Sequence, residues 1–142
     1  MTMARTLEPV TLQVDMPAIL AYAEITGDFN PLHVDPVFAA ATPMGGVIAH
    51  GTLSMNLVWQ SLARSFGPQA LAGSRLELRF ARPVRAGDTV QAGGTESAEA
   101  PGRFEVWVRN QDGVAVIEGI ATVPGAAAAG ATVSEDPGAA PD

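Results

Sequence analysis

The sequence predicts an α+β fold in which an antiparallel sheet is wrapped around one long central helix. The first observation is a stretch from about residue 52 to residue 66 that is apolar on most of its helical circumference, which is typical of a helix buried on most sides. The second is a series of about four strand-like segments between residues 75 and 123, with turn residues between them. One sheet wrapped around one helix would bury the apolar residues of both the helix and the strands.

The segments that precede the central helix are shorter. Residues 7–14 predict a short strand. Asp15 is placed to cap a following helix and Gly27 to end it. The Asp-Pro pair at residues 35–36 predicts a second, short helix through about Ala41, and the residues between the two helices form a turn-rich segment.

The segments that follow the central helix alternate between apolar and polar residues. Residues 75–80 alternate strictly, so Phe80 and the two leucines before it are expected to face a core. In the next strand, Gly93 and Gly94 predict a bulge or a sharp bend. The turn-like sequence NQDG predicts a hairpin between the last two strands. The four predicted strands cover residues 75–80, 88–99, 104–109 and 114–123.

Composition excludes several classes of function. The chain has 142 residues, 47% of them hydrophobic, which suits a single domain with a sizeable core. Its net charge of −7 argues against a general nucleic-acid binder or a polybasic membrane-surface protein. All eight basic residues are arginine, which excludes a lysine Schiff base, and the absence of cysteine excludes thiolate nucleophiles and cysteine-based zinc sites.

The C-terminal segment differs in composition from the rest. Residues 125–142 are rich in Ala, Gly and Pro and are predicted to be a disordered acidic tail, which leaves residues 1–124 as one domain. Three of the net negative charges lie in this tail, so the domain carries −4. No apolar run is long enough to span a bilayer, and the first nine residues do not resemble a signal peptide, so we expect a cytoplasmic protein without a membrane partner.

Both histidines lie in two segments rich in turn residues, GDFNPLHVD and AHGT. Asp28 and His33 are five residues apart with Pro31 between them, so a bent loop would bring a carboxylate to an imidazole, which is a general acid–base pair. Spacing alone favours the alternative that Asp28 caps a turn and His33 bonds locally. A mixed metal site that adds Asp35 and His50 is a further reading, but no ligand spacing supports it, so no metal is predicted.

Gly51 begins the buried helix, where backbone N–H groups are free and favour negative charge. A residue without a side chain there would let a substrate oxygen approach the amide, as in an oxyanion hole. Tight packing of the helix against the sheet explains a glycine equally well. Ser54 and Ser61 lie on the same helix without a GxSxG motif, so a serine hydrolase is poorly supported.

Four arginines fall within eleven residues of the first strand after the helix and its following loop. Four guanidinium groups could hold the phosphates of an anionic ligand. The alternative is a solvated strand face in which some of them pair with Glu77 and Asp88. The four residues are Arg75, Arg79, Arg82 and Arg85.

Three segments together resemble the signature of the MaoC-like acyl dehydratases, the group that contains the (R)-specific enoyl-CoA hydratases. They are TGDFNPLHVDPVFA, GVIAHGTLSM and RFARPVRAGDTV, and the resemblance covers most of the predicted domain. It implies a hot-dog fold, a homodimer, and reversible hydration of a trans-2-enoyl thioester of CoA or acyl-carrier protein to the (3R)-3-hydroxyacyl thioester. It implies no cofactor.

Carried over by motif position, the resemblance makes Asp28 and His33 the catalytic pair and Gly51 the oxyanion-hole donor. Asn30 and His50 would support them. Contacts with the substrate or CoA are assigned to Arg79, Arg82, Arg85 and Met55.

The chain departs from the family at one point. Some members carry a serine further along the central helix, whereas Ser54 lies about one turn too early and Ser61 slightly late. Two other functions stay open, an acyl-CoA thioesterase of the same fold and a non-catalytic acyl-CoA-binding subunit of a heteromeric dehydratase.

Overall fold

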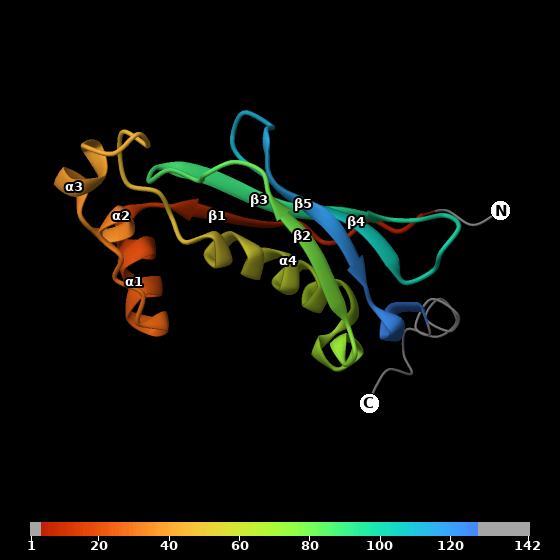
Figure 1. Cartoon of the computed structure of the whole chain (residues 1–142). Coiled ribbons are helices and arrows are strands. Elements are labelled where there is room, and N and C mark those ends of the chain that lie inside the picture. Colours follow the sequence, from red (N-terminus) through yellow and green to blue (C-terminus); the bar gives the residue numbers. More distant parts are fainter. Residues whose placement is uncertain (1–3, 128–142) are drawn as a thin grey trace.

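The computed structural model describes residues 4–127 and shows a curved antiparallel sheet packed on one long helix (Figure 1). This arrangement confirms the predicted α+β class. The strands are β1 (Val10–Val14), β2 (Arg75–Phe80), β3 (Asp88–Glu96), β4 (Arg103–Arg109) and β5 (Ala115–Thr122). The helices are α1 (Met16–Thr26), α2 (Pro31–Val34), α3 (Pro36–Ala40), α4 (Gly51–Phe66) and the 3₁₀ turn η1 (Pro68–Leu71). The strand order β1-β3-β4-β5-β2 leaves β1 and β2 as the two edges of the sheet.

Helix α4 is the predicted central helix, and it begins at Gly51 as the sequence indicated. Its buried side faces the inner side chains of β3 and β4, whose apolar residues alternate with exposed ones. Fully burying a side chain such as Phe104 or Leu62 contributes about 2 kcal/mol each and fixes the helix against the sheet. The N-terminus of α4 is thereby held at one end of the sheet, which positions the site described below.

The caps of α1 are those that the sequence predicts. The Asp15 carboxylate accepts a hydrogen bond from Ala18 N at 2.9 Å, and Gly27 ends the helix in the left-handed region at φ 74°. The turn-rich segment after Gly27 contains a short helix, α2, that the pattern did not predict. Its single turn is too short for hydrophobic periodicity to reveal, and it is started by the Asn30 side chain.

Two expectations about the sheet are wrong. Gly93 and Gly94 lie in an unbroken ladder between β3 and β4, and the register shift falls instead between Val108 and Arg109 of the β4–β5 pair. The glycines leave room for close neighbours, because a Cβ on Gly93 would lie 3.0 Å from the Trp107 ring nitrogen. Phe80 does not face the core, since it ends the edge strand and its side chain is 51% exposed.

The structure describes the first residues of the segment that the sequence assigns to the tail. Residues 124–127 form a helical turn, with Ala126 fully buried. A Cβ on Gly125 would collide with the carbonyl oxygen of Ala70, so this turn packs tightly against η1. The remainder of the predicted tail, residues 128–142, lies outside the described residues.

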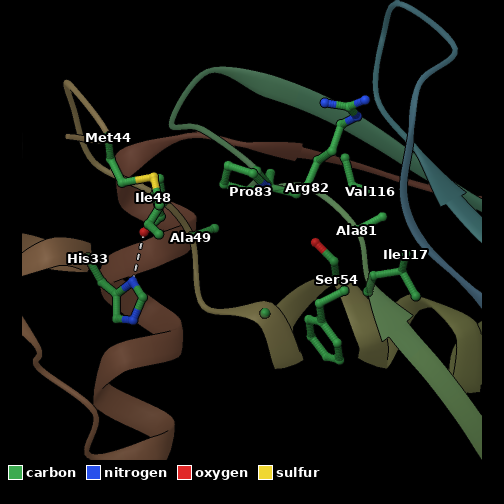
Figure 2. Close-up of a pocket in the computed structure, with 13 residues that line it drawn as sticks. His33, Met44, Ile48, Ala49, Ser54, Ala81, Arg82, Pro83, Val116 and Ile117 are labelled. Atoms are coloured by element: carbon green, nitrogen blue, oxygen red, sulfur yellow. Dashed lines mark hydrogen bonds between the residues drawn. The ribbon is translucent and has the colours of Figure 1, made fainter.

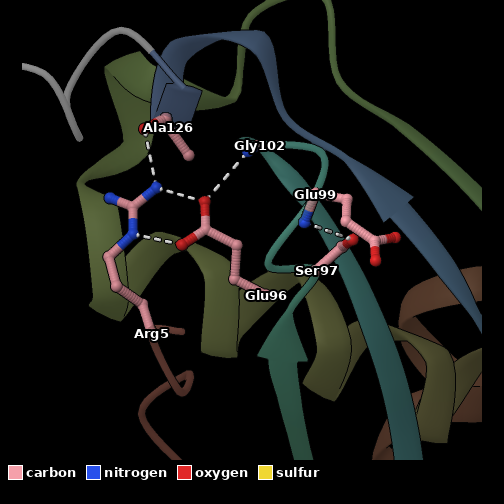
Figure 3. Close-up of polar contacts among 6 residues, drawn as sticks. All are labelled: Arg5, Glu96, Ser97, Glu99, Gly102 and Ala126. Atoms are coloured by element: carbon pink, nitrogen blue, oxygen red, sulfur yellow. Dashed lines mark hydrogen bonds and ion pairs between the residues drawn. The ribbon is translucent and has the colours of Figure 1, made fainter. Parts of the chain in front are cut away.

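A charged contact ties this C-terminal turn to the N-terminal segment (Figure 3). Arg5 donates two hydrogen bonds to the Glu96 carboxylate, at 2.8 and 2.7 Å, and a third to the carbonyl oxygen of Ala126 at 3.0 Å. The Arg5 guanidinium, helped by a hydrogen bond from Gly102 N–H, lowers the pKa of Glu96 to about 2. The pair thus holds β3 and both ends of the domain together at the end of the sheet opposite the N-terminus of α4.

Residues 4–127 contain no helix with the length and apolar character that a bilayer crossing requires.

Candidate active site

The loop between α1 and α2 presents the first carboxylate of the site. The left-handed Gly27 turns the chain out of α1, and the exposed Asp28 follows. Its Oδ1 accepts a hydrogen bond from Asn30 N at 3.2 Å, and the Asn30 side chain accepts one from Leu32 N at 3.0 Å, which starts α2. Asn30 therefore orients the Asp28 carboxylate and also begins the helical turn that carries His33.

A backbone carbonyl fixes the tautomer of the neutral His33 ring. Its Nδ1 lies 2.7 Å from the carbonyl oxygen of Ile48, which can only accept a hydrogen bond, so Nδ1 carries the proton (Figure 2). In the neutral ring, Nε2 then holds the free lone pair. This contact joins α2 to the segment that leads into α4, and it gives His33 the tautomer of a base at Nε2.

His50 lies between the two segments and is 4% exposed. Its Nε2 lies 2.9 Å from the backbone carbonyl oxygen of Asp28, so Nε2 carries the proton. The ring stacks on His33 with the centroids 4.0 Å apart, and it makes a T-shaped contact with the ring of Tyr22, whose centroid is 5.0 Å away. His50 thus connects the Asp28 loop to the start of α4 by packing and by one hydrogen bond.

Asp28, His33 and His50 converge: each offers one ligand atom, and these atoms lie within 4.8 Å of one another. The three groups have the chemistry to coordinate a metal ion, but one ring nitrogen of each histidine is already bound to a backbone carbonyl. Asp35, which the sequence added to this set, instead caps α3 by accepting hydrogen bonds from Val37 N and Phe38 N. A carboxylate beside a neutral imidazole with a free Nε2 can hold a water molecule and move its proton.

Gly51 is the first residue of α4, and its backbone N–H is one of the free donors at the positive end of that helix. Its lack of a side chain has a definite structural cause. A Cβ at this position would collide with Cε2 of Phe80 and lie 2.6 Å from Cδ2. The half-exposed ring of Phe80 therefore packs directly over Gly51, so any side chain at this position would have to displace the ring, whatever the substrate does.

Two of these groups, His33 and Gly51, border a cavity of about 310 Å³, whereas Asp28 and His50 are not part of its lining. His33, Gly51, Ser54 and Phe80 line it together with apolar residues from the segment before α4 and from the loop after β2. Figure 2 shows the Ser54 oxygen directed away from α4 toward the Ala81–Pro83 stretch. A largely apolar cavity beside an acid–base pair and a helix N-terminus can accept an acyl chain with its carbonyl at the polar end.

The arginine cluster is divided by the fold. Arg75 approaches Glu77, a pair that the interpretation as a solvated strand face predicted. Arg79 forms an ion pair with Glu118 of β5, a partner that the sequence did not indicate. Arg82 lines the cavity with its stem, and Figure 2 shows its guanidinium directed away from His33. Arg85 is not part of the lining but donates to the carbonyl oxygen of Met44, which is.

Met55 is not part of the cavity lining and packs against the core.

Three features of the site were not predicted from the sequence. They are the Ile48 carbonyl that sets the His33 tautomer, the Phe80 ring over Gly51, and Ser54 in the cavity wall. Only Ser54 carried a usable signal, since a residue three positions after Gly51 lies on the same side of a helix. The other two depend on contacts between segments that are distant in the chain.

Comparison with known proteins agrees with this geometry. The model of the MaoC like domain matches residues 2–117. The chain is 39% identical over 109 residues to an (R)-specific enoyl-CoA hydratase of Rhodospirillum rubrum, covering 74% of this chain and 75% of that protein. It is 46% identical over 74 residues to a 3-hydroxybutyryl-CoA dehydratase of Methylorubrum extorquens, covering 51% of this chain and 46% of that protein, so this match spans less than half of the relative.

Among solved structures, the (R)-hydratase of A. caviae involved in PHA biosynthesis superposes with a TM-score of 0.72 at 27% identity, over 87% of this chain and 98% of that one. This likeness confirms the hot-dog fold that the sequence resemblance implied. The family model spans most of the chain and includes Asp28, His33 and Gly51. The chain is therefore a member of the MaoC-like dehydratase family, a hot-dog hydro-lyase group.

Proposed function

We propose that this protein catalyses the reversible hydration of a trans-2-enoyl thioester to the (3R)-3-hydroxyacyl thioester. The observation that carries the proposal is the hydrogen bond that fixes the tautomer of His33. Its Nδ1–H is bound to the Ile48 carbonyl, so the neutral ring keeps a free Nε2 lone pair, and the His33 ring belongs to the cluster that contains the Asp28 carboxylate. The names of the hydratase relatives supply the substrate class.

In the hydration direction, the lone pair of His33 Nε2 accepts a proton from a water molecule that Asp28 holds. The oxygen of that water forms a bond to C3, and the π electrons of the C2–C3 double bond move toward the thioester oxygen. Gly51 N–H at the positive end of α4 stabilises the resulting enolate. The imidazolium then returns its proton to C2, so that one water molecule is added in total.

The acyl carrier is polyanionic in the case of CoA, whereas the protein has a net charge of −7. Binding of CoA therefore requires local cations near the cavity. Arg82 lines the cavity and Arg85 contacts Met44 of its lining, while Arg79 is paired with Glu118. Acyl-carrier protein presents its thioester on a phosphorylated arm as well. We assign the acyl chain to the cavity and the phosphates to these two arginines.

We also propose that the active form is a homodimer. Strand β2 pairs with β5 on one side only and lies at the edge of the sheet, and its last residue, Phe80, is half exposed while it covers Gly51. A second copy at this edge would bury both the free strand edge and the Phe80 ring. Light scattering of the purified full chain measures the mass directly, and a monomeric mass in an active preparation would contradict this assignment.

The function is tested by following the enoyl-thioester absorbance band with enoyl-CoA substrates of increasing acyl length, starting at crotonyl-CoA. Asp28→Asn and His33→Ala are expected to lower kcat by about 10³-fold or more, since each removes a proton-handling group. The matched control is Asp35→Asn, an exposed carboxylate in the same segment whose amide replacement can still cap α3. Its rate should stay within about twofold of wild type.

A thiol assay in the same reaction separates the two enzymatic functions, because a thioesterase releases free CoA and a hydratase does not. Release of CoA without loss of a double bond would replace the proposal with the thioesterase. A stable protein that does neither would indicate the non-catalytic binding subunit.

A further inference from the structure

Two serines of α4 are buried, and they differ in their hydrogen bonding. Ser61 is fully buried and donates a hydrogen bond to the backbone carbonyl of Glu8 at 2.5 Å. Ser54 is 1% exposed, and its hydroxyl has no hydrogen-bond partner within residues 4–127. Burying a hydroxyl without a partner is unfavourable, because its hydrogen bonds to water are lost and not replaced. Ser54 therefore lowers the stability of the domain, and that cost calls for a role in function.

The surroundings of Ser54 are those of a ligand site. It lines the same cavity as His33 and Gly51, and Figure 2 shows its oxygen directed into the space below Ala81–Pro83. Only three of the thirteen lining residues carry a polar side chain, namely His33, Ser54 and Arg82. Arg82 directs its charge away from His33, so Ser54 and His33 are the polar side chains at the reacting end.

Helix geometry places this hydroxyl near the expected thioester oxygen. Ser54 follows Gly51 by three residues, so it lies on the same side of α4, roughly 4.5 Å further along the axis. The Cα–Cβ bonds of a helix tilt toward its N-terminus, so the Ser54 side chain leans back toward the Gly51 amide. A carbonyl oxygen at Gly51 N–H can accept a second hydrogen bond on its other lone pair.

We propose that Ser54 is a catalytic residue whose hydroxyl donates a second hydrogen bond, beside that of Gly51 N–H, to the thioester carbonyl oxygen of the substrate. The bond strengthens as the π electrons of the double bond move onto that oxygen, and it weakens again when C2 takes its proton. No bond is broken at Ser54, and its proton stays on the hydroxyl throughout. This inference rests on the proposed hydratase function and adds a donor to it.

The kinetic test compares Ser54→Ala with Ser54→Thr and with the matched control Ser61→Ala in the full-length protein. Loss of one oxyanion donor is expected to lower kcat by about 10²-fold, with KM changed by less than about threefold. Ser54→Thr keeps the hydroxyl and should retain most of the rate. Ser61→Ala should turn over at the wild-type rate but melt at a lower temperature, because it leaves the Glu8 carbonyl without its donor.

The stability readout separates a functional role from a structural one. Ser54→Ala removes an unpartnered hydroxyl, so its melting temperature should equal or exceed that of wild type while its kcat falls. A parallel loss of stability and activity would show that Ser54 only supports the fold and would overturn the inference.

A spectroscopic arm tests the contact without turnover. In an Asp28→Asn background, infrared spectra of bound crotonyl-CoA labelled with ¹³C at C1 report the polarisation of the carbonyl. Adding Ser54→Ala should raise the C=O stretching frequency, and Ser54→Thr should not. An unchanged frequency, or a wild-type kcat in Ser54→Ala, overturns the inference while leaving the proposed function intact. Absence of hydratase activity in the wild-type protein overturns both.

Discussion

Replacing Gly51 by Ala tests the contact between Gly51 and Phe80 and its effect on the proposed catalysis. The added Cβ would collide with Cε2 of Phe80 and lie 2.6 Å from Cδ2, whereas carbon atoms settle at about 3.5–4.0 Å, so the ring must retreat by roughly 1 Å. Phe80 is half exposed and can move outward, which keeps the cost near the lower end of the overpacking range, about 1 kcal/mol. We expect the melting temperature to fall by about 3–5 °C.

The effect of Gly51→Ala on rate should be larger than the effect on stability. The Phe80 ring forms the cavity wall beside the Gly51 amide, and a displacement of about 1 Å at a reacting centre costs on the order of 10² in rate. We therefore expect hydration of crotonyl-CoA to slow by about 10- to 100-fold. The backbone N–H itself is retained, so the loss is a consequence of the collision.

A double-mutant cycle with Phe80→Ala checks this reasoning. In that background the colliding ring is absent, so Gly51→Ala should cost less than about 0.5 kcal/mol and less than about threefold in kcat relative to Phe80→Ala alone. Stability is measured by urea unfolding and rate by the enoyl-thioester absorbance. If Gly51→Ala costs the same in both backgrounds, or nothing in either, the contact with Phe80 is not the reason for glycine at this position.

Three further outcomes are expected. Folding lowers the pKa of Glu96 from its ordinary 4.5 to about 2, so its ion pair contributes stability that is complete above pH 4.5 and is lost as the pH falls toward 2. Thermal melts from pH 7 to 2.5 should show that the free energy of unfolding of wild type falls by on the order of 2 kcal/mol more than that of Glu96→Gln. Treatment with a metal chelator should leave hydration unchanged, since the His33 and His50 contacts are to backbone carbonyls; a lost rate restored by one divalent ion would contradict the proposed mechanism. Arg82→Ala should raise KM for crotonyl-CoA by about tenfold and weaken its salt dependence, with kcat preserved; equal KM values at low and high salt in both proteins would remove Arg82 from the phosphate site.

Much of the fold followed from local patterns. The cap at Asp15, the stop at Gly27 and the alternation of residues 75–80 each report a preference that acts within a few residues, so the sequence alone predicts them. The sequence pattern did not predict helix α2, because a single turn has no periodicity. The bulge predicted at Gly93 was wrong, because the reason for this glycine is its close neighbour Trp107, which lies on another strand.

The candidate site was predictable to a similar extent. Residue types made Asp28, His33 and Gly51 candidates for acid–base chemistry and anion stabilisation, but only the resemblance of their two segments to a known family assigned them these roles. Met55 could not be excluded in advance, because which residues of a helix line a cavity depends on the elements packed against it. The same holds for the four arginines, whose separation follows from the ion pair of Arg79 with β5.

The sequence by itself determined the fold class and the helix caps, since these depend on residue types and spacings within single segments, and its resemblance to a family named Asp28 and His33 as the expected acid–base pair. The tertiary structure alone decided the tautomer of His33, the packing of Phe80 over Gly51 and the lack of a partner for Ser54. Each of these depends on atoms that are distant in the chain and meet only when the sheet closes on α4. A hydrogen bond or a collision acts over a few ångströms, and no one-dimensional pattern records such distances.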